Sequence, residues 1–115
     1  MKTEEKFSLI EWNQFTRMMV METVTDRMAG NLSGDILAVL RDHVAVIKSL
    51  AGFTSAEILT EEDGRMVVFQ VTFSSRERLM GYHQGREYRQ LVTKINHFLI
   101  GDPVIKLFRR FEGAR

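Results

Sequence analysis

Two side chains in this sequence suit proton transfer, the imidazole of His83 and the carboxylate of Glu22. His83 stands in "GYHQGREYRQL", residues 81–91, among tyrosines and arginines. An imidazole titrates near neutral pH, so His83 is a candidate general base. A polar helix-end residue bonded to a carbonyl oxygen is the alternative reading, because the sequence shows no partner for His83.

Glu22 falls on a strand face that is otherwise apolar, made of Met18, Val20 and Val24. Burial raises the pKa of a carboxyl group, which would let Glu22 accept a proton or donate a hydrogen bond to a bound ligand. Pairing with an arginine such as Arg109, or a position at a wet end of the sheet, explains this glutamate equally well.

The remaining histidines and the absence of cysteine argue against a metal centre. His43 stands beside Asp42, and His97 falls near a predicted helix end, so both are expected at the surface. Three histidines without short ligand spacing give no metal signature. The sequence also lacks a glycine-rich phosphate loop, a nucleophile elbow and a carboxylate cluster suited to two metals.

Strand and helix patterns alternate along the first part of the chain. Residues 16–25, "TRMMVMETVT", predict a strand, and Ser33 can cap a following helix. Apolar residues recur in that helix at helical spacing until Gly52 stops it: Ile36, Leu40, Val44, Ile47 and Ala51. "TSAEILT" and "RMVVFQVTF" flank "EEDG", whose Asp-Gly pair favours a hairpin turn.

A capping box in "SSRE", formed by Ser74 and Glu77, predicts the start of another helix. Gly81 and Gly85 predict that this helix is short, kinks near Gln84 and continues as a longer one. "VIKLFRRF" predicts a last strand. The order strand, helix, strand, strand, helix, strand is typical of an α+β, ferredoxin-like split βαβ fold, a four-stranded antiparallel sheet with helices on one face.

Length and composition limit the organisation and the partners. Residues 16–115 are predicted to form one domain, with residues 1–15 as an N-terminal arm. The 16 Lys and Arg are scattered and the net charge is +1, which argues against a nucleic-acid partner. No apolar run approaches membrane-spanning length, so we expect no membrane partner. The lack of cysteine fits a reducing compartment, and the cytoplasm is the expected location.

Both faces of the predicted sheet carry apolar side chains. In the third strand Val67, Phe69, Val71 and Phe73 share one face, while Met66 and Val68 begin the other. Helices can cover only one face of a four-stranded sheet. Leaving such side chains in water forgoes roughly 1.5 to 3 kcal/mol for each one that could be buried. A homodimer packed sheet to sheet is therefore expected, and the alternative is that the N-terminal arm covers the second face.

Three segments, "AGFTSAEIL", "VVFQVTFSSRERLMGYHQGREYRQLVTKI" and "DPVIKLFRRF", together resemble the antibiotic-biosynthesis monooxygenase family of dimeric α+β barrels. The resemblance covers about residues 16 to 112. Where the family usually has a Trp-Glu-Ser motif, this chain has Phe73, Ser74 and Ser75, so the tryptophan is missing. Many members carry a histidine at the position of His83, and a second one where this chain has Tyr88.

The resemblance implies an apolar pocket between the sheet and the helices that binds a small apolar or aromatic ligand. Its lining residues would be Val20, Phe69, Phe73, Leu79 and Tyr88. It further implies a cofactor-independent monooxygenase in which His83 or Glu22 deprotonates a phenol or quinol, and the anion passes an electron to dioxygen without flavin or metal. A non-catalytic ligand-binding or interaction dimer is the alternative. A haem-degrading enzyme is disfavoured, because Glu22 and Thr93 stand where such relatives have asparagine and the axial histidine.

Overall fold

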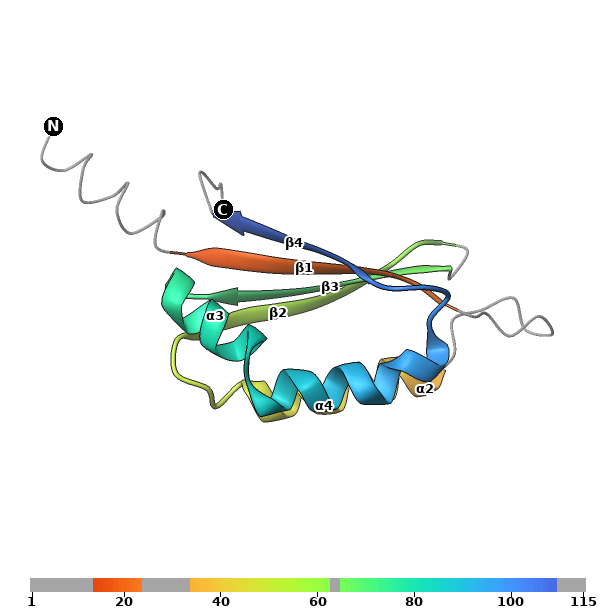
Figure 1. The fold of residues 1–115 in the computed structure, drawn as a ribbon, viewed down its shortest axis with the longest axis horizontal. Helices are drawn as coiled ribbons and strands as arrows, with labels where there is room; N and C mark the ends of the chain where they lie inside the picture. The colour runs from red at the N-terminus through yellow and green to blue at the C-terminus, as the bar shows by residue number, and fades with distance from the viewer. Residues whose placement is uncertain (1–13, 24–33, 63–64, 110–115) are drawn as a thin grey trace, which may run out of the picture.

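The computed structural model describes residues 14–23, 34–62 and 65–109. Four strands form one antiparallel sheet in the order β2-β3-β1-β4. These strands are β1 (Phe15–Glu22), β2 (Phe53–Thr60), β3 (Met66–Phe73) and β4 (Val104–Arg109). The helices α2 (Gly34–Ile47), α3 (Arg76–His83) and α4 (Arg86–Ile95), with the short 3-10 helix η1 (Asn96–Phe98), all lie on one side of the sheet (Figure 1). The predicted α+β fold with helices on one face is confirmed.

The two faces of β1 are the reverse of what the sequence suggested. Met19 and Met21 are fully buried toward the helices, beside Phe69 and Val67 of β3. Val20, one position away, therefore faces the opposite side of the sheet, since side chains alternate along a strand. The expectation that Val20 lies between the sheet and the helices is wrong. Each face of β1 carries apolar side chains, so hydrophobicity alone does not show which face turns toward the helices.

Helix α2 and the turn after it follow from local sequence. Ile36, Leu40 and Ile47 are fully buried and recur at helical spacing, which fixes the face that α2 turns to the sheet. Gly52 then adopts φ +84, a left-handed conformation that other residues rarely take. Its carbonyl oxygen accepts a hydrogen bond from the Ser74 amide at 2.8 Å, which holds the start of β2 close to the end of β3.

Helix α3 begins one residue later than the capping box predicted. The N-cap is Ser75, whose hydroxyl oxygen accepts a hydrogen bond from the Arg78 amide at 3.2 Å, and not Ser74. The expected interruption is confirmed, because α3 ends with Gln84 as its C-cap and α4 begins after Gly85. Two short helices with different axes replace one long helix, so consecutive turns can aim side chains in different directions (Figure 1).

The face of the sheet away from the helices, here called the open face, carries one apolar row that crosses all four strands. Strand pairing aligns its members side by side: Leu59, Val68, Val20 and Val104. The next row is charged at its two ends, with Glu57 on the β2 edge and Lys106 on the β4 edge, and Gln70 and Met18 lie between them. Glu22 belongs to this face as well and is exposed. No described helix or loop covers the open face in Figure 1.

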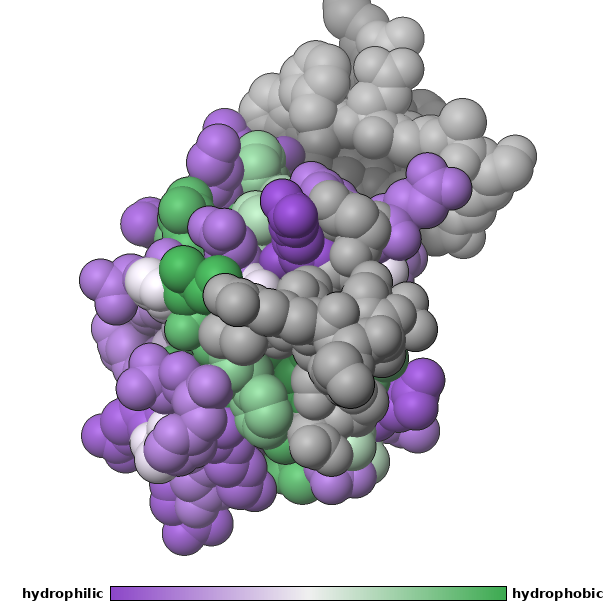
Figure 2. All heavy atoms as spheres, turned by 90° about the vertical axis from the view of Figure 1, so that its right-hand side faces the viewer, coloured by the Kyte–Doolittle hydropathy of each residue, from purple (hydrophilic) through white to green (hydrophobic). Residues whose placement is uncertain are grey.

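Strand β4 is exposed along its whole length. The helices pack on β1, β2 and β3, and they leave Ile105 and Leu107 uncovered on the helix side. Leu107 keeps 48% of its surface exposed and Phe108, on the open face, keeps 46%. The end view in Figure 2 also shows hydrophobic side chains at the surface between hydrophilic ones. Apolar surface is therefore available on more than one side of the molecule.

Candidate active site

The most unusual side chain of the described chain is Arg17, a fully buried arginine on the helix side of β1. Its Nε donates a hydrogen bond to Nδ1 of His83 at 2.9 Å. Its guanidinium carbon lies 4.0 Å from the centre of the Tyr88 ring, a cation–π contact. The His83 and Tyr88 rings also stack, with their centres 5.3 Å apart. Residues from β1, α3 and α4 thus converge on one point beneath the helix break.

The contact with Arg17 determines what His83 can do. Burial, and then the neighbouring Arg17 charge, lower the pKa of His83, so the imidazole is neutral at pH 7. Arginine can only donate, so Nδ1 must accept and carries no proton. The proton of the neutral ring is then on Nε2, which becomes a hydrogen-bond donor. In this arrangement Nε2–H of His83 can donate a hydrogen bond to a ligand. Nδ1, the basic nitrogen of the neutral ring, already accepts the hydrogen bond from Arg17.

The outer two nitrogens of Arg17 have no partner. Nη1 and Nη2 are both buried, and no hydrogen bond joins either to any described residue. A buried donor without a partner costs about 1 to 3 kcal/mol, and more when the group is charged. The guanidinium cannot escape this cost by becoming neutral, because arginine keeps its charge in folded proteins. This side chain is the strongest indication of a ligand site in the described residues.

A second buried polar pair lies further under the helices. Nε2 of His43 is 2.7 Å from the hydroxyl of Tyr82, and the Tyr82 ring stacks on Phe73. Burial lowers the pKa of His43 to about 4 and raises the pKa of Tyr82 above its usual value. Both groups are therefore neutral at pH 7. The expectation that His43 lies at the surface is wrong, because it is only 7% exposed.

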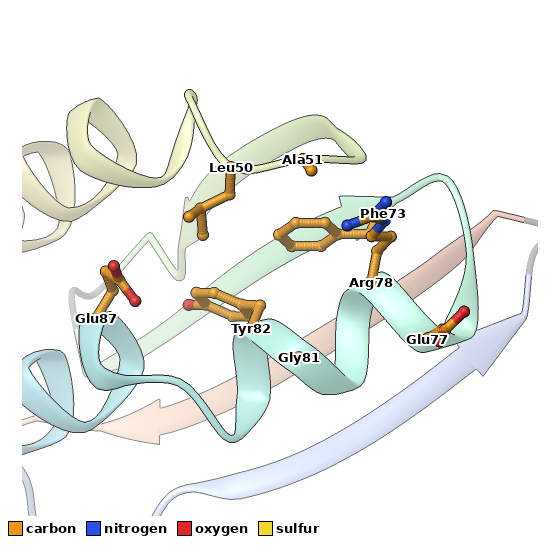
Figure 3. Close-up of a pocket in the computed structure, with 8 residues that line it drawn as sticks. All are labelled: Leu50, Ala51, Phe73, Glu77, Arg78, Gly81, Tyr82 and Glu87. Atoms are coloured by element: carbon orange, nitrogen blue, oxygen red, sulfur yellow. The ribbon is translucent and has the colours of Figure 1, made fainter.

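Two pockets flank helix α3. One, here called the loop pocket, has a volume of about 440 Å³ and lies under the connection between α2 and β2. Figure 3 shows the stacked rings of Phe73 and Tyr82 inside it, with Leu50 above them. Arg78 and Glu87 supply charges at its two ends. The loop pocket therefore combines an aromatic wall with charged ends.

The other, here called the β4 pocket, lies between α3 and β4 and has a volume of about 420 Å³. Its residues are Phe15, Arg76, Leu79, Met80, Leu107, Phe108 and Arg109. Leu107 is the strand partner of Arg17, and Phe15 precedes Arg17 by two positions on the same face of β1. Leu79 and Met80 lie one helical turn before His83. The Arg17–His83 pair therefore lies next to residues that line the β4 pocket, although neither of the two lines it.

Comparison with known proteins gives structural matches only: no protein-family model and no curated protein matches the sequence. SnoaB, a cofactor-independent oxygenase from Streptomyces nogalater, superposes with a TM-score of 0.71 at 12% identity, covering 88% of this chain and 96% of its own. A Caulobacter crescentus protein, named as a candidate antibiotic biosynthesis monooxygenase, has a TM-score of 0.72 at 13% identity over 94% of this chain and 99% of its own. This chain has the antibiotic biosynthesis monooxygenase fold.

Proteins with this fold differ in what is known of them. Rv0793 from Mycobacterium tuberculosis matches with a TM-score of 0.71 at 16% identity, over 89% of this chain and 99% of its own. Identities this low establish the shared architecture and leave the reaction open. The function of this chain must therefore be argued from its own side chains.

On this monooxygenase fold, the residues singled out from the sequence do not form one group. Leu79 lines the β4 pocket and Phe73 the loop pocket, while Phe69 and Tyr88 are buried in the core beside them. His83 and Tyr88 are brought together by Arg17. Val20 and Glu22 lie on the open face.

Sequence reasoning missed Arg17 and His43, although each carries a readable signal. Arg17 precedes Met19 and Met21 by steps of two, which places all three on one strand face. His43 falls three residues after Leu40 and four before Ile47, on the buried stripe of α2. A charged or polar residue in phase with a buried apolar set is the pattern that identifies both.

The described residues contain no group of three histidine, aspartate or glutamate side chains that could hold a metal ion. Within the same residues, no helix is long and apolar enough to span a bilayer.

Proposed function

We propose that this protein is a cofactor-independent monooxygenase acting on a small phenol or quinol that binds in the β4 pocket. The single observation that carries the proposal is the buried Arg17–His83 pair next to residues of that pocket, whose unpartnered N–H groups are donors for an oxygen atom of a ligand. Likeness to a fold that includes a cofactor-independent oxygenase supports it.

In this mechanism the protein makes a hydroxyl of the substrate acidic. Nε2–H of His83 and the Arg17 guanidinium stabilise the phenolate oxygen, so the phenol loses its proton to water more readily. The electron-rich anion transfers one electron to dioxygen, and the resulting radical and superoxide combine to form a carbon–oxygen bond. Loss of water then gives a quinone. The balance is one phenol plus O2 to one quinone plus H2O, so the substrate supplies all the electrons.

This mechanism assigns His83 a role different from the general base expected from the sequence. Its Nδ1 is engaged by Arg17, and proton abstraction would require that hydrogen bond to break. Glu22, the other expected base, faces the opposite side of the sheet from Arg17, since five positions separate them in one strand. Within one subunit, Glu22 does not contribute to the β4 pocket.

The test is oxygen consumption by purified, chelator-treated protein with a panel of phenols and quinols. We expect turnover by the wild type, a fall of at least tenfold in His83→Ala, and little change in Glu22→Gln. His83→Gln, which keeps an N–H donor, should retain more activity than His83→Ala if donation is the role. Absence of turnover across the panel would refute the proposal.

A non-catalytic ligand-binding protein is the second candidate. Its support is that neither expected base is available in the β4 pocket. Nδ1 of His83 is hydrogen-bonded to Arg17, and Glu22 lies on the open face. Saturable binding of aromatic ligands, seen as thermal stabilisation without product, would favour it over the monooxygenase. A haem-degrading activity is disfavoured, and haem titration without a Soret shift would dismiss it.

We also propose that two copies pack with their open faces together. The apolar row of Leu59, Val68, Val20 and Val104 would be buried in both copies. A two-fold axis parallel to the strands sets the β2 edge of one copy over the β4 edge of the other, so Glu57 meets the partner's Lys106. Glu57→Lys and Lys106→Glu should each weaken the dimer in sedimentation experiments, and the double exchange should restore it. A wild type that sediments as a monomer would refute this assembly.

A further inference from the structure

The unpartnered edge of Arg17 identifies a ligand class for the β4 pocket. Its guanidinium holds a permanent positive charge with zero exposed surface, and no described carboxylate pairs with it. A buried charge of this kind is costly unless an opposite charge pairs with it. A neutral ligand would supply hydrogen bonds but leave the charge uncompensated. The missing partner is therefore an anion.

The contacts of Arg17 also decide how that anion binds. Nε is used by His83, and the Tyr88 ring covers one face of the guanidinium plane at 4.0 Å. What remains is the edge formed by Nη1 and Nη2. Two parallel N–H groups on that edge match two oxygen atoms held side by side, as in a carboxylate. A single oxygen would satisfy only one of the two nitrogens.

The surroundings favour an organic anion with an apolar body. The β4 pocket provides Phe15, Leu79, Met80 and Leu107 next to this edge. Leu107 belongs to a strand that no helix covers and is 48% exposed, so its side chain can move aside for a ligand. Arg76 and Arg109 also line this pocket, so its apolar walls are combined with positive charge. Such a combination suits an amphipathic anion.

We propose that Arg17 binds, through Nη1 and Nη2, an aromatic anion with two adjacent oxygen atoms, either a carboxylate or an ionised hydroxyl–carbonyl pair. This inference rests on the proposed function for the position of the site, the β4 pocket. The ligand class itself can be tested separately, because anion binding is measured without turnover. His83 is the positioning residue: its Nδ1 accepts the hydrogen bond from Nε, which fixes the orientation of the guanidinium and leaves Nη1 and Nη2 for the ligand.

The experiment compares three probes of similar size on the full chain by calorimetry and NMR. Benzoate represents the carboxylate, tropolonate the ionised hydroxyl–carbonyl pair, and benzamide a neutral analogue of benzoate. We expect one or both anions to bind at least tenfold more tightly than benzamide. Arg17→Gln should weaken anion binding by about 10-fold to 100-fold, the usual effect of losing hydrogen bonds to a charged group. Arg89→Gln, on the exposed surface of α4, is the matched control and should bind as the wild type does.

The wild type also gives a direct readout, so the test does not depend on how Arg17→Gln folds. Anion binding should shift the NMR signals of the Arg17 guanidinium nitrogens, while benzamide should leave them in place. Equal binding of benzoate and benzamide, unshifted signals, or unchanged affinity in a folded Arg17→Gln variant would each overturn the proposal. Anion binding without oxygen consumption would refute only the monooxygenase. Oxygen consumption by a wild type that binds benzoate and benzamide equally would refute only the anion site.

Discussion

Replacing Arg17 with methionine should stabilise the ligand-free protein while abolishing its binding of anions. Methionine has a similar length and no polar nitrogen, so it can fill the same buried space. The substitution loses the hydrogen bond to His83, worth about 1.5 to 3 kcal/mol, and the contact with Tyr88, worth about 2 kcal/mol when desolvated. These losses sum to about 4 kcal/mol.

The gains exceed these losses. Two buried donors without partners disappear, each costing about 1 to 3 kcal/mol, and the methionine side chain contributes about 1.5 to 3 kcal/mol of apolar burial. These gains sum to about 6 kcal/mol, so the free energy of unfolding should rise by about 2 kcal/mol. For a domain of this size that corresponds to an increase in Tm of about 8 °C.

Urea unfolding followed by circular dichroism, at fixed protomer concentration and without anions, measures this difference. Arg89→Met, a substitution on the exposed surface of α4, is the control and should change stability by less than about 0.5 kcal/mol. A folded Arg17→Met variant that is less stable than the wild type by 1 kcal/mol or more would refute the reasoning. That result would mean that the outer nitrogens of Arg17 are satisfied in the free protein.

Two other substitutions test the packing under the helices. The pKa of His43 is about 4 in the folded protein and 6.5 in the unfolded chain, so acid protonates the unfolded state first. The stability that neutral His43 provides is complete above pH 6.5 and is lost as the pH falls toward 4, by about 3 kcal/mol in total. His43→Gln should remove that part of the pH dependence in denaturant titrations, and an unchanged profile would contradict it. Gly52→Ala should cost about 1 to 3 kcal/mol, because alanine at φ +84 is strained and its Cβ would lie 2.7 Å from Cγ of Arg78. Gly81→Ala, whose Cβ meets nothing within 4 Å, is the control and should not destabilise the protein.

The arrangement of strands and helices was readable from the sequence because local signals agreed with one another. Helical spacing in α2, the Gly81 and Gly85 pair between α3 and α4, and the apolar alternation of β3 each had one interpretation. Where two neighbouring residues offered the same chemistry, the sequence could not choose. Ser74 and Ser75 are both able to cap a helix, and only the structure shows that Ser75 does so.

The candidate site was harder to predict because it depends on a fully buried arginine, Arg17. His83 was chosen from its chemistry, but its partner Arg17 comes from a strand 66 positions away. Fully buried arginines are rare, so an arginine in a methionine-rich strand is ordinarily assigned to the solvent side. Both faces of β1 were otherwise apolar, and the expected pocket used the face that carries Val20. The alternation of side chains along β1 predicts the buried face correctly only if Arg17 is placed in the interior with Met19 and Met21.

The exposure of β4 has a consequence for local motion. Among the described residues this strand is hydrogen-bonded to β1 alone, and they leave both of its faces open to solvent. An outer strand with so little burial separates from its neighbour at a small fraction of the cost of global unfolding. Amide hydrogens of β4 should therefore exchange with deuterium well before those of β3, and each brief fraying would uncover the guanidinium beneath.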